Sequence, residues 1–144
     1  MKQFASVVRE LRVWLGAISW IRLAFPYHLY LLFGGVAILF LQQLLIQVVP
    51  YSGYRIIDIL FNKIPIHVIG YYGFFLGIWL TLISKNVKYL PYGLWAYAFV
   101  ILFPFDYINL YTIVSAALYI LFGYGLFRYS ATSYSESDAH SASF

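Results

Sequence analysis

The sequence contains no cysteine. Its absence excludes structural disulfides, metal sites built from thiolates, and thiol–disulfide chemistry within a membrane. Charge is also scarce, because Asp, Glu, Lys and Arg make up only 10% of the 144 residues, whereas a soluble domain carries about 25%. A soluble chain of this length would expose too much surface for so few charges to cover.

Apolar residues are abundant instead. The chain is 63% hydrophobic and 22% aromatic, and the apolar residues fall in long runs. This pattern predicts an all-α integral membrane protein. The formal charge of +4 does not indicate a nucleic-acid partner, because the basic residues flank the apolar runs, as they do in membrane proteins that contact anionic lipid.

A helix needs about 20 predominantly apolar residues to cross a bilayer. Four runs approach this length, at about residues 29–49, 66–84, 91–105 and 108–127. We therefore predict a bundle of four transmembrane helices over residues 26–129.

The first 25 residues show a different pattern. Apolar residues such as Leu11 and Trp14 recur at helical spacing, while Arg9 and Arg12 fall on the opposite side. This favours an amphipathic helix over residues 1–25 that lies in the membrane interface and ends at Pro26, with Arg9, Arg12 and Arg22 against anionic headgroups. The alternative is that the helix packs against a partner protein. The Ser-rich residues 130–144 are expected to form a disordered tail.

The distribution of basic residues predicts the orientation of the chain. Only Arg55 and Lys63 lie on one side of the predicted bundle. The other side carries seven basic residues: Lys2, Arg9, Arg12, Arg22, Lys85, Lys88 and Arg128. By the positive-inside rule both termini are expected in the cytoplasm, with the protein in the plasma membrane.

Three glycines of the second run, Gly70, Gly73 and Gly77, fall on one helical face. Gly73 and Gly77 form a G-x-x-x-G pair, which allows two helix backbones to approach closely in a membrane. The pair predicts close packing, either against another helix of this chain or against a separate protein.

Three glutamines, Gln42, Gln43 and Gln47, interrupt the first run. We interpret them as interhelical contacts, because amide side chains hydrogen-bond between membrane helices. The alternative is a polar path for a solute, lined by Gln43, Gln47 and Asp106. Asp106 also has a simpler interpretation, since Asp and Asn stabilise tight turns and cap the helix that follows.

No catalytic, cofactor or metal site is expected. His28 and His67 fall at opposite ends of the predicted spans, roughly 30 Å apart, so they cannot share a site. We expect a small non-catalytic scaffold or accessory subunit that assembles with itself or with a larger membrane complex. The alternative is a small oligomeric transporter or channel for a polar or uncharged solute.

Overall fold

The computed structural model describes residues 2–50, 53–106 and 108–141, and every secondary-structure element in this part of the chain is helical. The elements in order are α1 (Lys2–Gly16), α2 (Ser19–Ala24), the 3-10 helix η1 (Phe25–Tyr27), α3 (His28–Val48), α4 (Tyr54–Asp58), the π-helix η3 (Ile59–Lys63), α5 (Ile66–Ile83), the 3-10 helix η4 (Val87–Tyr89), α6 (Leu90–Leu102) and α7 (Leu110–Ser141).

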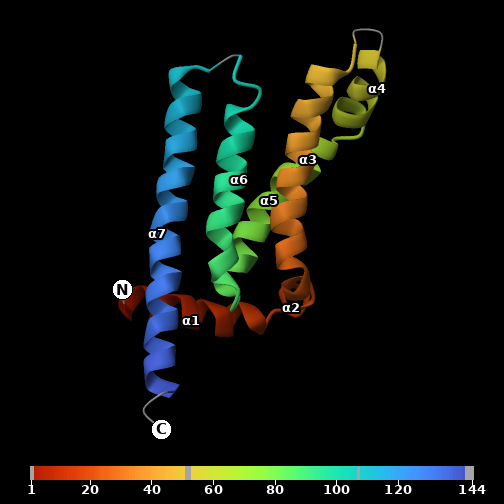
Figure 1. Ribbon diagram of the computed structural model, residues 1–144. Helices are drawn as coiled ribbons and strands as arrows, with labels where there is room; N and C mark the ends of the chain where they lie inside the picture. The colour runs from red at the N-terminus through yellow and green to blue at the C-terminus, as the bar shows by residue number, and fades with distance from the viewer. Residues whose placement is uncertain (1, 51–52, 107, 142–144) are drawn as a thin grey trace.

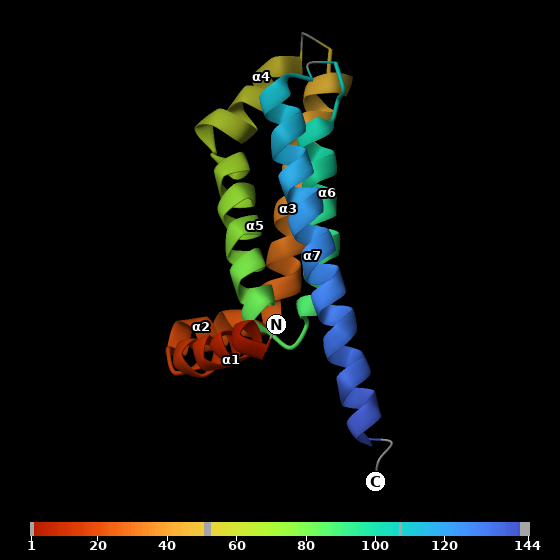
Figure 2. The same ribbon diagram turned by 90° about the vertical axis from the view of Figure 1, so that its left-hand side faces the viewer.

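The four long helices α3, α5, α6 and α7 run alternately up and down, while α1 and α2 lie across one end of them (Figures 1 and 2). We call this end the α1 end and the opposite end, which carries α4, the α4 end. The predicted all-helical fold is therefore confirmed for the described residues.

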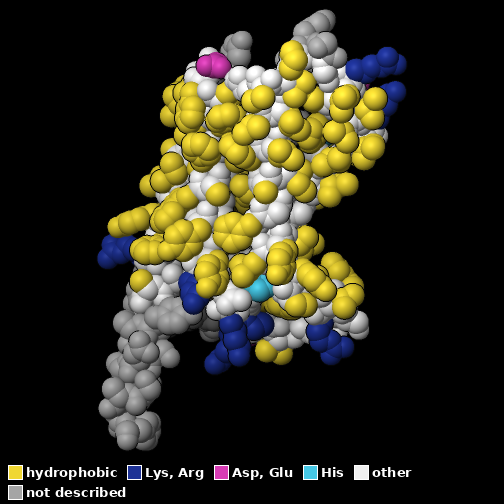
Figure 3. Space-filling view, turned by 45° about the vertical axis from the view of Figure 1, so that its right-hand side comes forward, with side chains coloured by type: hydrophobic (Ala, Val, Ile, Leu, Met, Phe, Trp, Pro, Cys, Tyr) yellow, Lys and Arg dark blue, Asp and Glu magenta, His cyan; other side chains and the backbone are white. Residues whose placement is uncertain are grey.

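Three helical stretches are long and apolar enough to cross a membrane: Ser19–Val48, Ile66–Ile83 and Leu110–Ala131. The remaining apolar stretch, Val87–Leu102, is shorter. Its main part, α6, has 13 residues and rises about 20 Å, against a hydrocarbon core of roughly 30 Å. The face shown in Figure 3 is covered by hydrophobic side chains, and its Lys and Arg side chains gather toward the α1 end and at one corner of the α4 end.

The third apolar run ends earlier than the expected residue 105. α6 stops at Leu102, and Phe103 has an extended backbone with ψ 136°. Pro104 follows, and a residue before proline is pushed out of the helical region by steric conflict with the proline ring. Phe105 then adopts a positive φ of 72°, which turns the chain toward α7.

The N-terminal segment differs from the expected single helix over residues 1–25. α1 ends at Gly16, and a turn at Ala17 and Ile18 separates it from α2. The chain turns between α2, which lies across the end of the long helices, and α3, and Pro26 lies at this turn (Figure 1). It sits in the first turn of η1, where a missing N–H costs nothing, and η1 leads directly into α3.

The C-terminal segment also differs from the expected disordered tail over residues 130–144. α7 continues to Ser141 and extends past α1 (Figure 2). Residues 131–141 contain no Gly or Pro that would end the helix. Residues 142–144 lie outside the described part of the chain.

α3 and α5 make the most extensive helix contact, and three glycines create it. A Cβ added at Gly35 would lie 2.6 Å from the carbonyl oxygen of Gly70, and one added at Gly77 would lie 2.5 Å from Cα of Leu32. Backbone therefore touches backbone here. A Cβ at Gly73 would meet nothing within 4 Å. The close pair on α5 is thus Gly70 and Gly77, not the expected Gly73 and Gly77.

α6 and α7 form the second closely packed pair. Gly123 on α7 lies against the indole of Trp95, whose Nε1–H donates to the carbonyl of Ile120 at 3.3 Å. The rings of Tyr97 and Tyr119 meet edge to face, with centroids 4.9 Å apart. The two pairs join in a common core of Leu32, Val36, Phe74, Leu90, Leu94 and Val100.

Candidate functional site

Four polar residues of the α1 end, Arg12, His28, Ser84 and Asn86, form one connected cluster, which begins at Arg12. Nη2 of Arg12 donates to the carbonyl of Ser84 at 2.9 Å, and Nε donates to the carbonyl of Ile83. The last carbonyls of a helix have no partner within the helix and carry partial negative charge. Arg12 therefore caps the C-terminus of α5 and fixes α1 to it.

His28 lies at the first position of α3 and is 7% exposed. Its Nδ1 is 2.5 Å from the carbonyl oxygen of Phe25, which can only accept, so Nδ1 carries the proton. Its Nε2 accepts from Nδ2 of Asn86 at 3.2 Å. His28 thus links the start of α3 to the loop after α5.

Ser84 completes the cluster from the end of α5. Its hydroxyl donates to the carbonyl of Thr81 at 2.8 Å and accepts from the backbone N–H of Asn86 at 3.0 Å. A catalytic serine would instead give its proton to a base such as His28. The hydrogen bonds of Ser84 and His28 therefore hold helix ends and a turn together.

Thr81 adds an unusual feature beside this cluster. Its side chain is fully buried, and its hydroxyl has no hydrogen-bond partner among the described residues. An unpaired buried hydroxyl costs stability, about 1–3 kcal/mol. Thr81 lies one turn after Gly77 on the face of α5 that packs against α3.

The other two arginines expected at a lipid surface are not part of this cluster. Arg9 and Arg22 are exposed, whereas Arg12 is half-buried and bonded to α5. The sequence did not distinguish Arg12, which caps α5, from the two exposed arginines. Helix carbonyls accept the same hydrogen bonds in every helix, so the sequence carries no signal that identifies α5 as the acceptor for Arg12.

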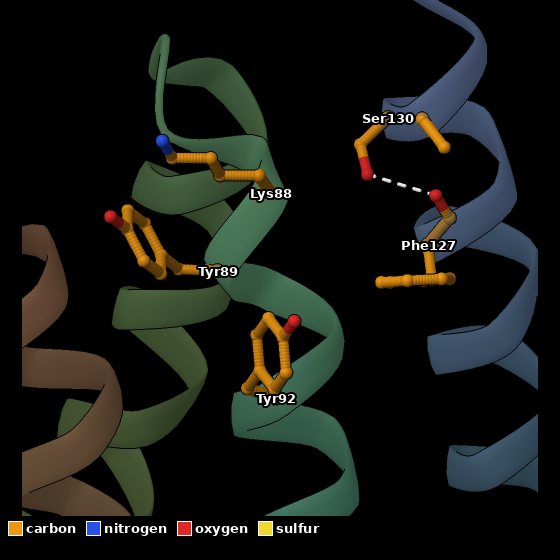
Figure 4. A pocket seen from close by; sticks show the side chains of 6 residues that line it. Lys88, Tyr89, Tyr92, Phe127 and Ser130 are labelled. Atoms are coloured by element: carbon orange, nitrogen blue, oxygen red, sulfur yellow. Dashed lines mark hydrogen bonds between the residues drawn. The ribbon is translucent and has the colours of Figure 1, made fainter. Parts of the chain in front are cut away.

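A cleft of about 380 Å³ opens beside the cluster, between η4 with the start of α6 and the end of the apolar part of α7. Its lining residues are Lys88, Tyr89, Tyr92, Phe127, Ser130 and Ala131. Figure 4 shows Phe127 and Ser130 projecting from α7, with Lys88, Tyr89 and Tyr92 on the opposite wall. The sequence did not predict that these residues form a cleft, because the cleft joins segments about 40 residues apart.

At the α4 end, the structure brings together two of the three residues proposed to line a path. Nε2 of Gln47 donates to Oδ2 of Asp106 at 3.1 Å, and both side chains are exposed. Gln42 and Gln43 are half-buried on α3. Neither has a side-chain hydrogen bond to the residues whose side chains the structure describes. Gln47 is therefore the one glutamine of the three with a defined bond between distant segments in that part of the chain.

The turn after α6 is closed by Asn109, as the capping interpretation expected. Oδ1 of Asn109 accepts from the backbone N–H of Thr112 and from its hydroxyl, both at 2.8 Å. This is the geometry of a helix N-cap at the start of α7.

The two histidines within the predicted bundle lie at opposite ends of it. His28 belongs to the α1 end, while His67 begins α5 at the α4 end, where its Nδ1–H donates to the carbonyl of Phe61 at 2.5 Å. They do not form a shared site.

Gly35, which packs against α5, was missed in the sequence, although the adjacent glycines of "FGGV" within an apolar run were a usable signal.

Comparison of the chain with models of protein families, with curated proteins and with solved structures finds no match.

Proposed function

We propose that this chain is a small non-catalytic membrane protein that acts as a scaffold or accessory subunit and assembles with itself or with a larger membrane complex. In this proposal α3, α5, α6 and α7 all span the bilayer, the short α6 being accommodated inside the bundle. α1 and α2 lie along the membrane surface. The position of α1 and α2 across the ends of the long helices supports this arrangement (Figure 1).

The observation that carries the proposal is the one-sided packing of α7. This helix packs mainly against α6. Only 11% of the 18-residue apolar stretch within it is buried in the chain. Leu121 and Phe122 are 65% and 66% exposed. A hollow of about 310 Å³ on the same helix is lined by Ser115, Leu118, Tyr119 and Phe122. Membrane helices associate by close packing of side chains, and such a hollow suits a side chain from a second helix.

We further propose that the α1 end faces the cytoplasm of a cell whose plasma membrane holds the protein. Arg9, Arg12, Arg22, Lys85 and Lys88 belong to segments at this end. Arg55 and Lys63 belong to α4 and η3 at the opposite end. This asymmetry agrees with the positive-inside rule and supports a cytoplasmic location for both termini.

The assembly proposal is tested by placing a photo-crosslinking amino acid at Phe122 in cell membranes. The control carries it at Trp79, which is 52% exposed on α5. We expect the probe at position 122 to crosslink to a protein, either a second copy or another subunit. The probe at position 79 should crosslink to no protein. Crosslinking to lipid alone at both positions, together with a monomeric mass and no copurifying protein in mild detergent, would exclude the proposal.

The contact between Gln47 and Asp106 favours one second candidate, a small oligomeric transporter or channel for a polar or uncharged solute. In this alternative the two side chains line the entrance at the α4 end, with Gln43 further along the path. Flux of a small polar solute into proteoliposomes that is lost in Gln47→Leu would support it. Flux equal to that of protein-free liposomes would remove it.

A further inference from the structure

The cleft between η4, the start of α6 and α7 lies at the level where the apolar part of α7 ends. Its lining includes Ser130 and Ala131, the last residues of the apolar stretch Leu110–Ala131. This is the depth at which a bilayer changes from hydrocarbon to headgroup. The volume of about 380 Å³ falls in the range of small-molecule sites.

One wall of the cleft is aromatic. Tyr92 meets Trp95 edge to face, with ring centroids 5.7 Å apart, and Trp95 in turn lies 5.9 Å from Phe127. Trp95 is fixed by its hydrogen bond to the carbonyl of Ile120. Tyr92 and Phe127 form the apolar floor of the cleft, and Trp95, which does not line it, contacts both rings and continues the apolar surface along α6.

The rim of the cleft is polar and positively charged. Lys88 lines the cleft from the η4 side, and its ammonium lies 5.1 Å from the centre of the Tyr89 ring, on the side away from α7 (Figure 4). The hydroxyl of Ser130 is buried near the opposite edge and donates to the carbonyl of Phe127 at 2.9 Å. None of the six lining residues that the structure describes is acidic. Lys85 and Arg128 stand close to this rim in the sequence and add positive potential.

We propose that this cleft binds one anionic glycerophospholipid, with its phosphate at Lys88 and the upper part of its acyl chains on the floor of Tyr92 and Phe127. Lys88 offers a flexible point charge, which suits phosphate. The hydroxyl group of Tyr92 can donate a hydrogen bond to a phosphate or ester oxygen. Basic pockets between membrane helices bind acidic headgroups in this way. The proposal does not depend on whether the chain assembles with a partner.

The test is native mass spectrometry of the full chain purified in mild detergent and titrated with phosphatidylglycerol, phosphatidylcholine or inorganic phosphate. Wild type is compared with Lys88→Gln and with the matched control Lys85→Gln, an exposed lysine three residues away that does not line the cleft. We expect one phosphatidylglycerol to bind saturably. Its affinity should fall at least about tenfold in Lys88→Gln and stay within about twofold in Lys85→Gln, because a charged hydrogen bond is lost only in the first.

A second variant, Phe127→Leu, tests the aromatic floor while keeping an apolar side chain in place. We expect this variant to lose affinity for phosphatidylglycerol, and we expect inorganic phosphate, which has no acyl chain, to bind neither the wild type nor the variant saturably. Equal losses in Lys88→Gln and Lys85→Gln would overturn the site, because the attraction would then be a general effect of positive charge. Equal binding of phosphatidylcholine, or saturable binding of inorganic phosphate at the same site, would overturn the assignment of an anionic lipid.

Discussion

Substitution of Gly35 by alanine should separate α3 from α5. The added Cβ would lie 2.6 Å from the carbonyl oxygen of Gly70 and 2.7 Å from Cα of Phe74. Both atoms belong to the backbone of α5, so neither can rotate away as the end of a side chain would. The strain can be relieved only if the two helices move apart.

The size of the effect follows from these distances. Carbon atoms in ordinary contact lie about 3.5–4.0 Å apart, so the helices must separate locally by roughly 1 Å. A gap of about 0.5–1 Å forfeits a quarter to a half of the dispersion energy of each contact across it. The side chains affected include Leu32 and Phe74, which are fully buried between the helices. Overpacking of this kind typically costs about 1–3 kcal/mol, or about 5- to 150-fold in the unfolding equilibrium.

The neighbouring residue provides the control. A Cβ at Gly34 would meet nothing within 4 Å, so Gly34→Ala should change stability by less than about 0.5 kcal/mol. Both variants are unfolded reversibly in mixed micelles by increasing the fraction of dodecyl sulfate, with fluorescence of the four tryptophans as the signal. Gly73→Ala and Gly77→Ala give the same comparison on α5, with the loss expected only at Gly77. Equal stability of Gly34→Ala and Gly35→Ala would refute the close backbone approach.

Arg12→Gln removes the cap on α5, so hydrogen exchange of the α1 amides should become faster, while Arg9→Gln should leave it unchanged; equal exchange in both variants would contradict the cap. Asn109→Ala should destabilise the start of α7 by about 1 kcal/mol in the same mixed-micelle unfolding, and Asn109→Asp should restore most of it. In a double-mutant cycle, Gln47→Leu and Asp106→Ala should show a coupling of about 0.6 kcal/mol, and additive losses would mean that the hydrogen bond contributes nothing.

α3 and α5 could be predicted from the sequence because each is a long apolar run with a clear end. α3 and α5 begin and end within one residue of the expected boundaries. The length of α6 was overestimated because its apolar character continues through Phe103 and Phe105, beyond the point where Pro104 stops the helix. Hydropathy measures composition, whereas the end of a helix depends on backbone geometry.

The packing face of α5 could be predicted only in part. Gly70 and Gly77 are seven residues apart, which is about 20° short of two full turns of the helix. Gly73 lies about 60° from Gly70 around the helix axis. All three glycines therefore share a broad face, but α3 packs along only one line of it. The position of that line is set by Gly35 on the partner helix, so it cannot be read from α5 alone.

The contacts within the polar cluster at the α1 end could not be predicted from the sequence for a related reason. Its bonds join residues far apart in the chain, such as His28 to Asn86. Several of its acceptors are backbone carbonyls, which look alike at every position. Side-chain identity predicted that these residues lie near a membrane surface, but it did not predict that they meet.

The cap on α5 also has a consequence for the order in which the protein forms during synthesis. Arg12 leaves the ribosome 71 residues before its acceptor Ile83, a delay of about 4–14 s at 5–20 residues per second. During this interval α3 can form, but the C-terminus of α5, which Arg12 contacts, has not yet been made. The two hydrogen bonds of Arg12 can form only after residue 84 has been added. The first helix to be made therefore reaches its place in the fold only after two of the long helices have been made.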